Sequence, residues 1–161
     1  MKNVTGSLKV DLAQYRAMEA FAMFASDLDA ASRQQLSRGQ RLMELLKQPQ
    51  YSPFPVEEQV ASIWAGTTGR LDPVPVPDIR RFEAEFLDYL RREHSGILSG
   101  IRESGTFDDD TDTALTDAYD GFARQFETSE GESIRVGKEA DVEPLGDEDV
   151  EQEQIVKQRR G

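Results

Sequence analysis

Three aspartates at alternate positions are the side chains best placed to hold a metal ion. Asp108, Asp110 and Asp112 occupy positions 1, 3 and 5 of a calcium-binding loop, in which carboxylate oxygens converge on one ion. The sixth position of that loop needs glycine for a sharp turn but holds Thr113, and the twelfth needs a bidentate glutamate but holds Tyr119. We therefore expect the aspartates to begin a helix, whose amino end favours negative charge, and we expect no metal site.

Two further patterns could carry chemistry, a phosphate-binding loop and a lone histidine. Residues 131–138 read GESIRVGK, but five residues separate the glycines where the loop has four, and Glu139 follows the lysine where a serine or threonine would bind magnesium. His94 is the only histidine, and no cysteine, serine motif or second histidine accompanies it. The sequence predicts a linker at the first pattern, a helix end at His94 and no catalytic residue.

The composition excludes several classes of protein. Lys and Arg number 19 against 31 Asp and Glu, and the net charge of -12 repels the phosphates of nucleic acids and of anionic membranes. Cysteine is absent, so disulfides and thiolate chemistry are excluded. No apolar run approaches the roughly 20 residues that span a bilayer, and the amino terminus lacks a signal peptide. We expect a cytoplasmic chain without nucleic-acid partners and without direct membrane insertion.

The chain divides into two parts of different composition. All the aromatic residues lie at or before Phe126, and the segment that follows is rich in acidic residues. A chain of 161 residues has room for one domain and a tail. We therefore predict a domain at 1–127 and an acidic extension at 128–161.

Helical periodicity in residues 1–127 predicts an all-α helical bundle of about five to six helices. The predicted helices cover residues 8–25, 29–47, 55–66, 77–90 and 110–127. Prolines and turn residues predict a loop at 67–77, and a broken turn is predicted through 95–98, ending near Gly105. The third helix is expected to bury Val56, Val60, Ile63 and Trp64.

Ordered motifs between residues 3 and 127 resemble the alpha subunit of the F-type ATP synthase. The matching segments are GSLKVDLAQYR at 6–16, SDLD at 26–29, Arg38-Gly39, LLKQPQYSP at 45–53 and VEEQV at 56–60. The resemblance implies the C-terminal helical domain of the non-catalytic, regulatory alpha subunit of a bacterial, proton-translocating enzyme. In that family three alpha and three beta subunits surround the gamma rotor and support ATP synthesis, as a peripheral complex on the cytoplasmic face of the cell membrane.

The resemblance also implies where nucleotide lies. The family's Lys-Gln-x-Gln turn lies beside the adenine of the non-catalytic nucleotide, which assigns Gln48 and Gln50 to that contact, although the same turn could serve only to join two helices. The family's phosphate-binding loop, magnesium-binding strand and catalytic-site arginine lie upstream of this domain. We expect Met1 to mark the start of a fragment that alone binds no cofactor and does not hydrolyse ATP, whereas the complete alpha subunit binds ATP and Mg²⁺.

The turn between the first two predicted helices is a candidate rotor contact. By resemblance, Ser26, Asp27, Leu28 and Asp29 correspond to the acidic loop of the beta subunit that meets gamma. Acidic side chains can form fast, salt-sensitive contacts with a basic helix. The same residues form a helix-capping signal, and one carboxylate can cap the helix while its neighbour faces the rotor.

Residues 128–161 extend beyond the usual end of the family's alpha subunits, near Phe126. Eight of the fifteen residues at 139–153 are acidic, so we expect a largely disordered tail, with a strand at 134–136 and a helix at 147–160 as candidate elements. Such a short helix needs a partner to persist. The residues expected to act are Asp147, Glu148, Asp149, Glu151, Glu153, Lys157, Arg159 and Arg160.

Two readings of the extension and of the whole chain stay open. By resemblance to bacterial alpha subunits with similar tails, the extension restrains ATP hydrolysis by binding gamma, with epsilon and beta as further candidate partners. The alternative is a tail that only improves solubility. A second class of function is a stand-alone acidic helical adaptor that binds a basic protein.

Overall fold

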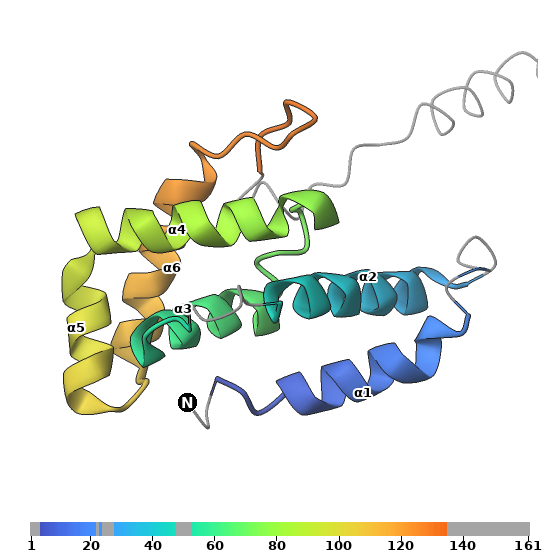
Figure 1. The fold of residues 1–161 in the computed structure, drawn as a ribbon, viewed down its shortest axis with the longest axis horizontal. Helices are drawn as coiled ribbons and strands as arrows, with labels where there is room; N and C mark the ends of the chain where they lie inside the picture. Colours follow the sequence, from blue (N-terminus) through green and yellow to red (C-terminus); the bar gives the residue numbers. More distant parts are fainter. Residues whose placement is uncertain (1–3, 22, 24–27, 48–52, 135–161) are drawn as a thin grey trace, which may run out of the picture.

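The computed structural model describes residues 4–21, 23, 28–47 and 53–134, which fold into a helical bundle (Figure 1). Six α-helices and one 3₁₀ turn make up the regular structure of these ranges. The β-structure within them is a single antiparallel bridge between Glu127 and Ser133. The predicted all-α fold with about five to six helices is confirmed.

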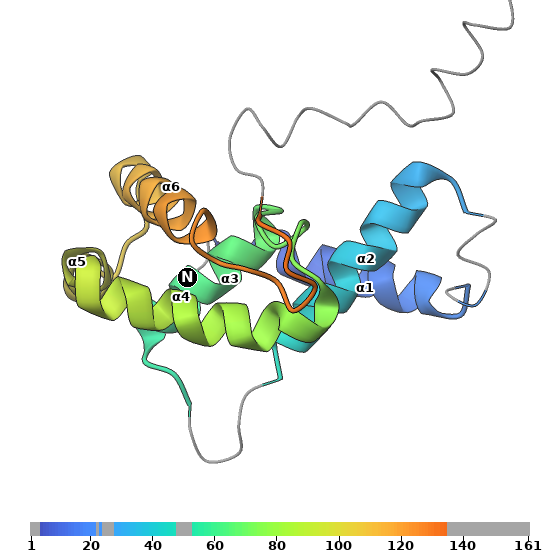
Figure 2. The same ribbon diagram turned by 90° about the horizontal axis from the view of Figure 1, so that it is seen from above.

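The first two helices form a hairpin at one end of the molecule, which we call the outer hairpin (Figure 2). Helix α1 (Leu8–Glu19) lies along helix α2 (Ala30–Leu45). The predicted first helix, 8–25, is too long, because α1 ends at Glu19 and Phe21 beyond it is 57% exposed with no core to pack against. Ala22 and Ala25, which extend the predicted apolar stripe, lie outside the described residues.

The remaining helices form the body. They are α3 (Val56–Thr67), the 3₁₀ turn η2 (Val76–Asp78), α4 (Ile79–Glu93), α5 (Ser95–Ser104) and α6 (Asp109–Ala123). Helix α4 crosses the middle of the body, and α5 and α6 lie at the end away from the outer hairpin (Figure 2). Phe82 of α4 is fully buried, and its ring lies against the rings of Phe86, Tyr119, Phe122 and Phe126. Aromatic packing between α4 and α6 is therefore the centre of the core.

Two further details of the predicted elements are wrong. Residues 95–104 form a helix and not a broken turn, because Leu98 and Ile101 are buried in the core and this packing outweighs the low helix propensity of Gly96 and Gly100. The left-handed Gly105, with φ of 62°, ends that helix near the predicted place. Val56 is 53% exposed, since it lies in the first turn of α3 beyond the reach of the core.

The last predicted helix is also too long. It was expected over 110–127, but α6 ends at Ala123 and the chain turns through residues 127–134 to pack back on the body. The division of the chain at residue 127 stays a prediction. The candidate helix at 147–160 lies outside the described residues.

Candidate functional site

The predicted rotor-contact turn is described at two of its four residues. Asp29 is exposed, and its Oδ1 accepts a hydrogen bond of 3.0 Å from the backbone N–H of Ser32, which begins α2. Hydrogen bonds from Ser32 hold the pKa of Asp29 below its usual range. Leu28 is half-buried, and Ser26 and Asp27 lie outside the described residues. Asp29 therefore caps the helix while staying exposed, and its contact with the rotor, like that of Asp27, stays a prediction.

Close backbone packing holds α1 against α2. Gly39 is buried in α2, and a Cβ added there would overlap the Cβ and the ring of Tyr15. Tyr15 is the one buried residue of α1, so this contact fixes the separation of the two helices. A glycine is required because any side chain at this position would push the helices apart.

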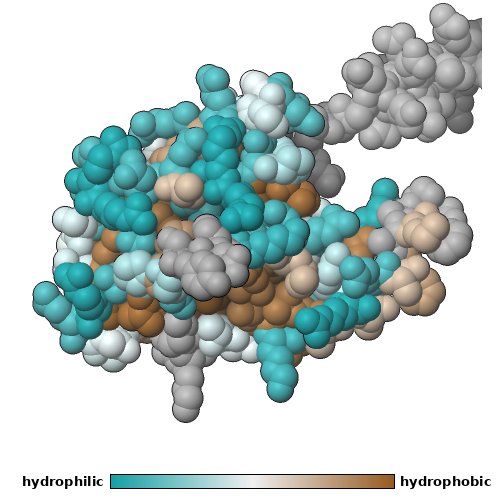
Figure 3. All heavy atoms as spheres, in the orientation of Figure 1, coloured by the Kyte–Doolittle hydropathy of each residue, from teal (hydrophilic) through white to brown (hydrophobic). Residues whose placement is uncertain are grey.

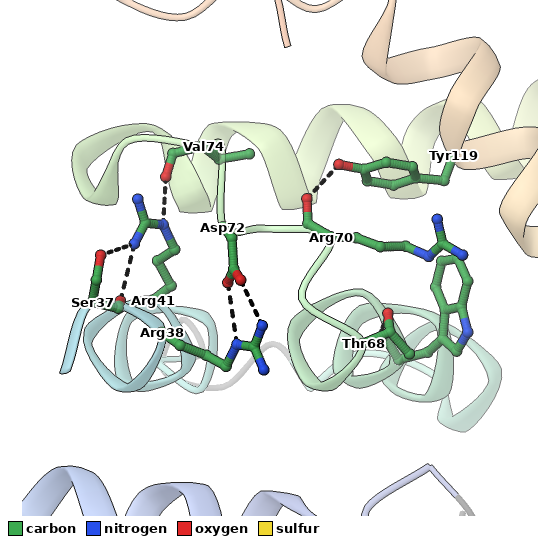
Figure 4. Close-up of polar contacts among 9 residues, drawn as sticks. Ser37, Arg38, Arg41, Thr68, Arg70, Asp72, Val74 and Tyr119 are labelled. Carbon is green, nitrogen blue, oxygen red and sulfur yellow. Dashed lines mark hydrogen bonds and ion pairs between the residues drawn. The ribbon is translucent and has the colours of Figure 1, made fainter. Parts of the chain in front are cut away.

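Polar contacts tie α2 to the loop between α3 and η2 (Figure 4). The guanidinium of Arg38 donates to both carboxylate oxygens of Asp72, with Nε–Oδ1 at 3.3 Å and Nη2–Oδ2 at 2.6 Å. One helical turn later, Arg41 Nε donates to the carbonyl of Val74 at 2.7 Å, and Arg41 Nη1 donates to the carbonyl and the hydroxyl of Ser37. The pKa of Arg38 is raised by its bond to Asp72, whereas burial lowers that of Arg41.

The same loop is fixed to the body by aromatic residues. The guanidinium of Arg70 lies 4.5 Å from the ring centre of Trp64 and 5.3 Å from that of Tyr119. The hydroxyl of Tyr119 donates to the backbone carbonyl of Arg70 (Figure 4), and burial raises the pKa of Tyr119. Leu71 and Val74 are buried between these contacts. The proline-rich loop is therefore an ordered segment of the body that also binds α2 of the outer hairpin.

The turn assigned to the adenine contact lies outside the described residues, at 48–52, so Gln48 and Gln50 stay predictions. Its flanks are described: Lys47 Nζ pairs with Glu44 at 2.5 Å, and Gln59 Nε2 donates to the carbonyl of Phe54 at 2.7 Å. Leu46 is 40% exposed on one side of the turn. Val56 is exposed on the other side of the turn, so exposed apolar side chains flank the turn on both sides.

Two of the three aspartates considered for metal binding, and the lone histidine, have structural partners. Asp108 caps α6 by accepting from the backbone N–H of Thr111 at 2.8 Å, and Asp112 accepts from Trp64 Nε1 at 2.7 Å. His94 ends α4, with its Nε2 3.2 Å from the Tyr89 hydroxyl. The predictions of a capped helix start and of a helix-end histidine are confirmed.

Comparison with known proteins identifies the family. Residues 1–122 match the family described as the ATP synthase alpha/beta chain, C terminal domain. The chain belongs to this ATP synthase family.

Alignments with individual relatives extend beyond residue 122, where the match to the family ends. The chain is 72% identical over all 161 residues to the ATP synthase subunit alpha of Nocardioides sp. strain JS614, and 66% identical over 155 residues to that of Thermobifida fusca. It is 55% identical over 161 residues to the subunit alpha of Cutibacterium acnes. These alignments cover 29%, 28% and 29% of the relatives, so the chain spans less than a third of their length. The first and third run through the acidic extension as well.

Several residues of this ATP synthase domain were not singled out from the sequence. Asp72, Arg41 and Arg70 lie in or against a loop that periodicity analysis treats only as a connection. Asp78 and Arg81 join the start of α4 to residues 127–129. The one signal in the sequence for the packing of residues 127–134 is Ile134, an apolar residue in a polar stretch. It is 5% exposed and lies in the core.

No helix in the described ranges is both long and apolar enough to span a membrane.

Proposed function

We propose that this chain is the C-terminal part of the non-catalytic, regulatory alpha subunit of a proton-translocating F-type ATP synthase. It packs in the head with beta subunits around the gamma rotor, where it supports ATP synthesis, and its extension restrains ATP hydrolysis. The observation that carries the proposal is the match to curated alpha subunits over the whole chain, extension included. The assembled enzyme is peripheral, on the cytoplasmic face of the cell membrane.

The outer hairpin supports the role in assembly. Val10 is 54% exposed, Phe21 57% and Met23 90%, all on or just beyond α1. Figure 3 shows hydrophobic surface in the band between α4 and α1, below the hydrophilic face of the body. Exposed apolar side chains of this kind mark surfaces that other proteins cover. In the proposed head, gamma meets the tip at Ser26, Asp27, Leu28 and Asp29, and Asp29 also caps α2.

The nucleotide role belongs to the complete alpha subunit. Gln48 and Gln50 would contact the adenine of the non-catalytic ATP, while Mg²⁺ and the phosphates would be held by residues upstream. The exposed Leu46 and Val56 support this proposal, because they border the turn and would be covered by the upstream nucleotide domain. Alone, the chain is expected neither to bind ATP nor to hydrolyse it.

The extension is proposed to act as a directional restraint. Its acidic residues Asp147, Glu148, Asp149, Glu151 and Glu153, followed by Lys157, Arg159 and Arg160, would order as a helix on gamma, or on epsilon or beta. A segment that orders only when bound can hold and release the rotor. An adaptor role for the chain is less well supported, since the match covers part of a much longer subunit in each relative cited above.

The test is ATP hydrolysis and ATP synthesis by the assembled enzyme, with alpha either intact or truncated after Ile134. Truncation at this residue keeps the packed segment 127–134, so the helical domain is unchanged. Faster hydrolysis with nearly unchanged synthesis is expected. Equal rates in both directions would leave the extension as a solubilising tail.

A further inference from the structure

The segment that follows α6 forms a small closed turn, which we call the clasp (residues 127–134). The N–H of Thr128 donates to the carbonyl of Glu132 at 3.0 Å, and the N–H of Glu132 donates to the hydroxyl of Thr128 at 3.0 Å. Gly131, with φ of 77°, supplies the left-handed residue of the turn and donates to the carbonyl of Thr128 at 2.9 Å. The clasp is therefore a built element and not the first part of a free tail.

Two residues at the start of α4 form hydrogen bonds with the clasp. Asp78 Oδ2 accepts from both the backbone N–H of Ser129 at 2.9 Å and its hydroxyl at 3.0 Å. Arg81 Nη2 donates to the carbonyl of Glu127 at 2.6 Å, and the same guanidinium lies 4.3 Å from the ring centre of Phe126. The clasp is thus attached at Glu127 and Ser129, two of its first three residues.

The far end of the clasp is held by burial. Ile134 is 5% exposed and belongs to the hydrophobic core, and Thr128 is 7% exposed. Residues on both sides of the turn are therefore fixed, and residues 135–161 continue from a defined point on the body.

The use of Asp78 needs an explanation that helix capping does not supply. It precedes the first residue of α4, yet its buried carboxylate makes no capping bond to the backbone of that helix; Oδ1 pairs with Arg81 at 3.5 Å, and Oδ2 reaches Ser129, 51 positions away. The hydrogen bonds from Ser129 hold the pKa of Asp78 below its usual range, so the carboxylate stays ionised at neutral pH. Burial of a carboxylate costs free energy unless hydrogen bonds compensate for the lost water. The two bonds from Ser129 therefore bind Asp78 specifically.

We propose that Asp78 is a positioning residue: through the clasp it fixes where the extension leaves the domain, and restraint of ATP hydrolysis requires this attachment. The proposal rests on the proposed function of the extension. A tail that starts from a fixed point samples a smaller volume, so its end is presented to one neighbouring subunit at a higher effective concentration. If the clasp is released, the point at which the extension is attached moves back to Phe126. The connecting segment is then longer, and the effective concentration of the end of the extension is lower.

The first readout is structural and uses the 161-residue chain. Asp78→Ala is expected to make the amides of the clasp exchange with solvent about tenfold faster or more, since two hydrogen bonds from Ser129 and the ion pair with Arg81 are lost. Asp88→Ala is the control, because Asp88 lies in α4, pairs with Arg92 at 3.0 Å and makes no bond to the described residues of the clasp, so the clasp amides should be unchanged. Ser129→Pro opens the clasp without touching α4, and it replaces Asp78→Ala should that variant fail to fold.

The second readout is ATP hydrolysis and synthesis by the assembled enzyme carrying each variant. The proposal expects Asp78→Ala and Ser129→Pro to raise hydrolysis toward the rate found on truncation after Ile134, with synthesis unchanged and Asp88→Ala like wild type. If truncation raises hydrolysis but the opened clasp does not, the positioning role is wrong and the restraining extension stands. If truncation itself changes nothing, both ideas fail, whatever the exchange data show.

Discussion

Helices α1 and α4 differ sharply in how they are held. α4 buries six residues, and Phe82 alone lies against four aromatic rings. α1 buries Tyr15 alone and packs on α2, at the edge of the molecule (Figure 1). α2 in turn is tied to the body through Arg38 and Arg41 as well as through its leucines.

The difference shows which region of the chain is self-sufficient. Burial of large apolar side chains contributes about 1.5–3 kcal/mol each, so the body can persist by its own packing. The outer hairpin leaves Val10, Phe21 and Met23 exposed, and its helix α1 depends on one close contact with α2. We expect such a region to open at lower free energy than the core, and in the proposed assembly a partner subunit would cover it.

The largest effect is expected from Phe82→Ala in the body. The ring is fully buried, so its loss leaves a cavity and should lower the free energy of unfolding by about 3–5 kcal/mol. Urea unfolding of the chain measures this. Phe21→Ala removes the same ring from the outer hairpin, where it is 57% exposed, and should change stability by about 0.5 kcal/mol or less. Equal losses would break the comparison.

Gly39→Ala is expected to damage the outer hairpin selectively. The added methyl group overlaps Tyr15, and the cost of overpacking should be about 1–3 kcal/mol, seen as faster amide exchange in α1 with the body unchanged. Gly100→Ala is the control, because a Cβ there meets nothing within 4 Å and should stabilise α5 by roughly 0.5–1 kcal/mol. Loss of the whole fold in Gly39→Ala would show that the hairpin and body are one unit.

Asp72→Ala tests the polar tie between the two regions. The ion pair with Arg38 is bidentate but its side chains are 34% and 27% exposed, so we expect a loss of about 1 kcal/mol that shrinks in high salt. Thermal unfolding at low and high ionic strength measures it. A loss that does not respond to salt would mean that Asp72 acts through the loop conformation and not through its charge.

The smallest effect is expected from Glu83→Gln, inside the body. Burial raises the pKa of Glu83, which accepts a hydrogen bond from the hydroxyl of Ser62. Because the pKa of Glu83 is higher in the folded state than in the unfolded state, its contribution to the free energy of unfolding is greatest at pH values below the unfolded-state pKa. This contribution is lost as the pH rises through the folded-state pKa. The neutral amide removes this loss, so the variant should be more stable by about 0.5–1 kcal/mol at neutral pH.

The control for that prediction is Glu85→Gln, on the exposed face of the same helix. Unfolding free energies between pH 4 and 8 should be flatter in Glu83→Gln and parallel to wild type in Glu85→Gln. A destabilised Glu83→Gln at neutral pH would mean that the ionised carboxylate is needed where it lies.

Sequence reasoning was most successful where apolar periodicity is strong. The predicted helix at 77–90 corresponds to α4, which buries Phe82, Phe86, Leu87 and Leu90, and the capping signal that includes Asp29 predicted the start of α2. It failed at 95–104, where two glycines hide a helix that tertiary packing imposes. It could not find Asp72 or Asp78, because long-range polar pairing leaves no local pattern.

Amide hydrogen exchange of the intact chain tests the account most directly, by comparing α1 with α4. We expect the amides of α1 to exchange through openings of much lower free energy than those of α4, and to become protected when the alpha subunit is assembled with its partners. Equal protection of the two helices in the isolated chain would contradict the account, since the outer hairpin would then need no partner.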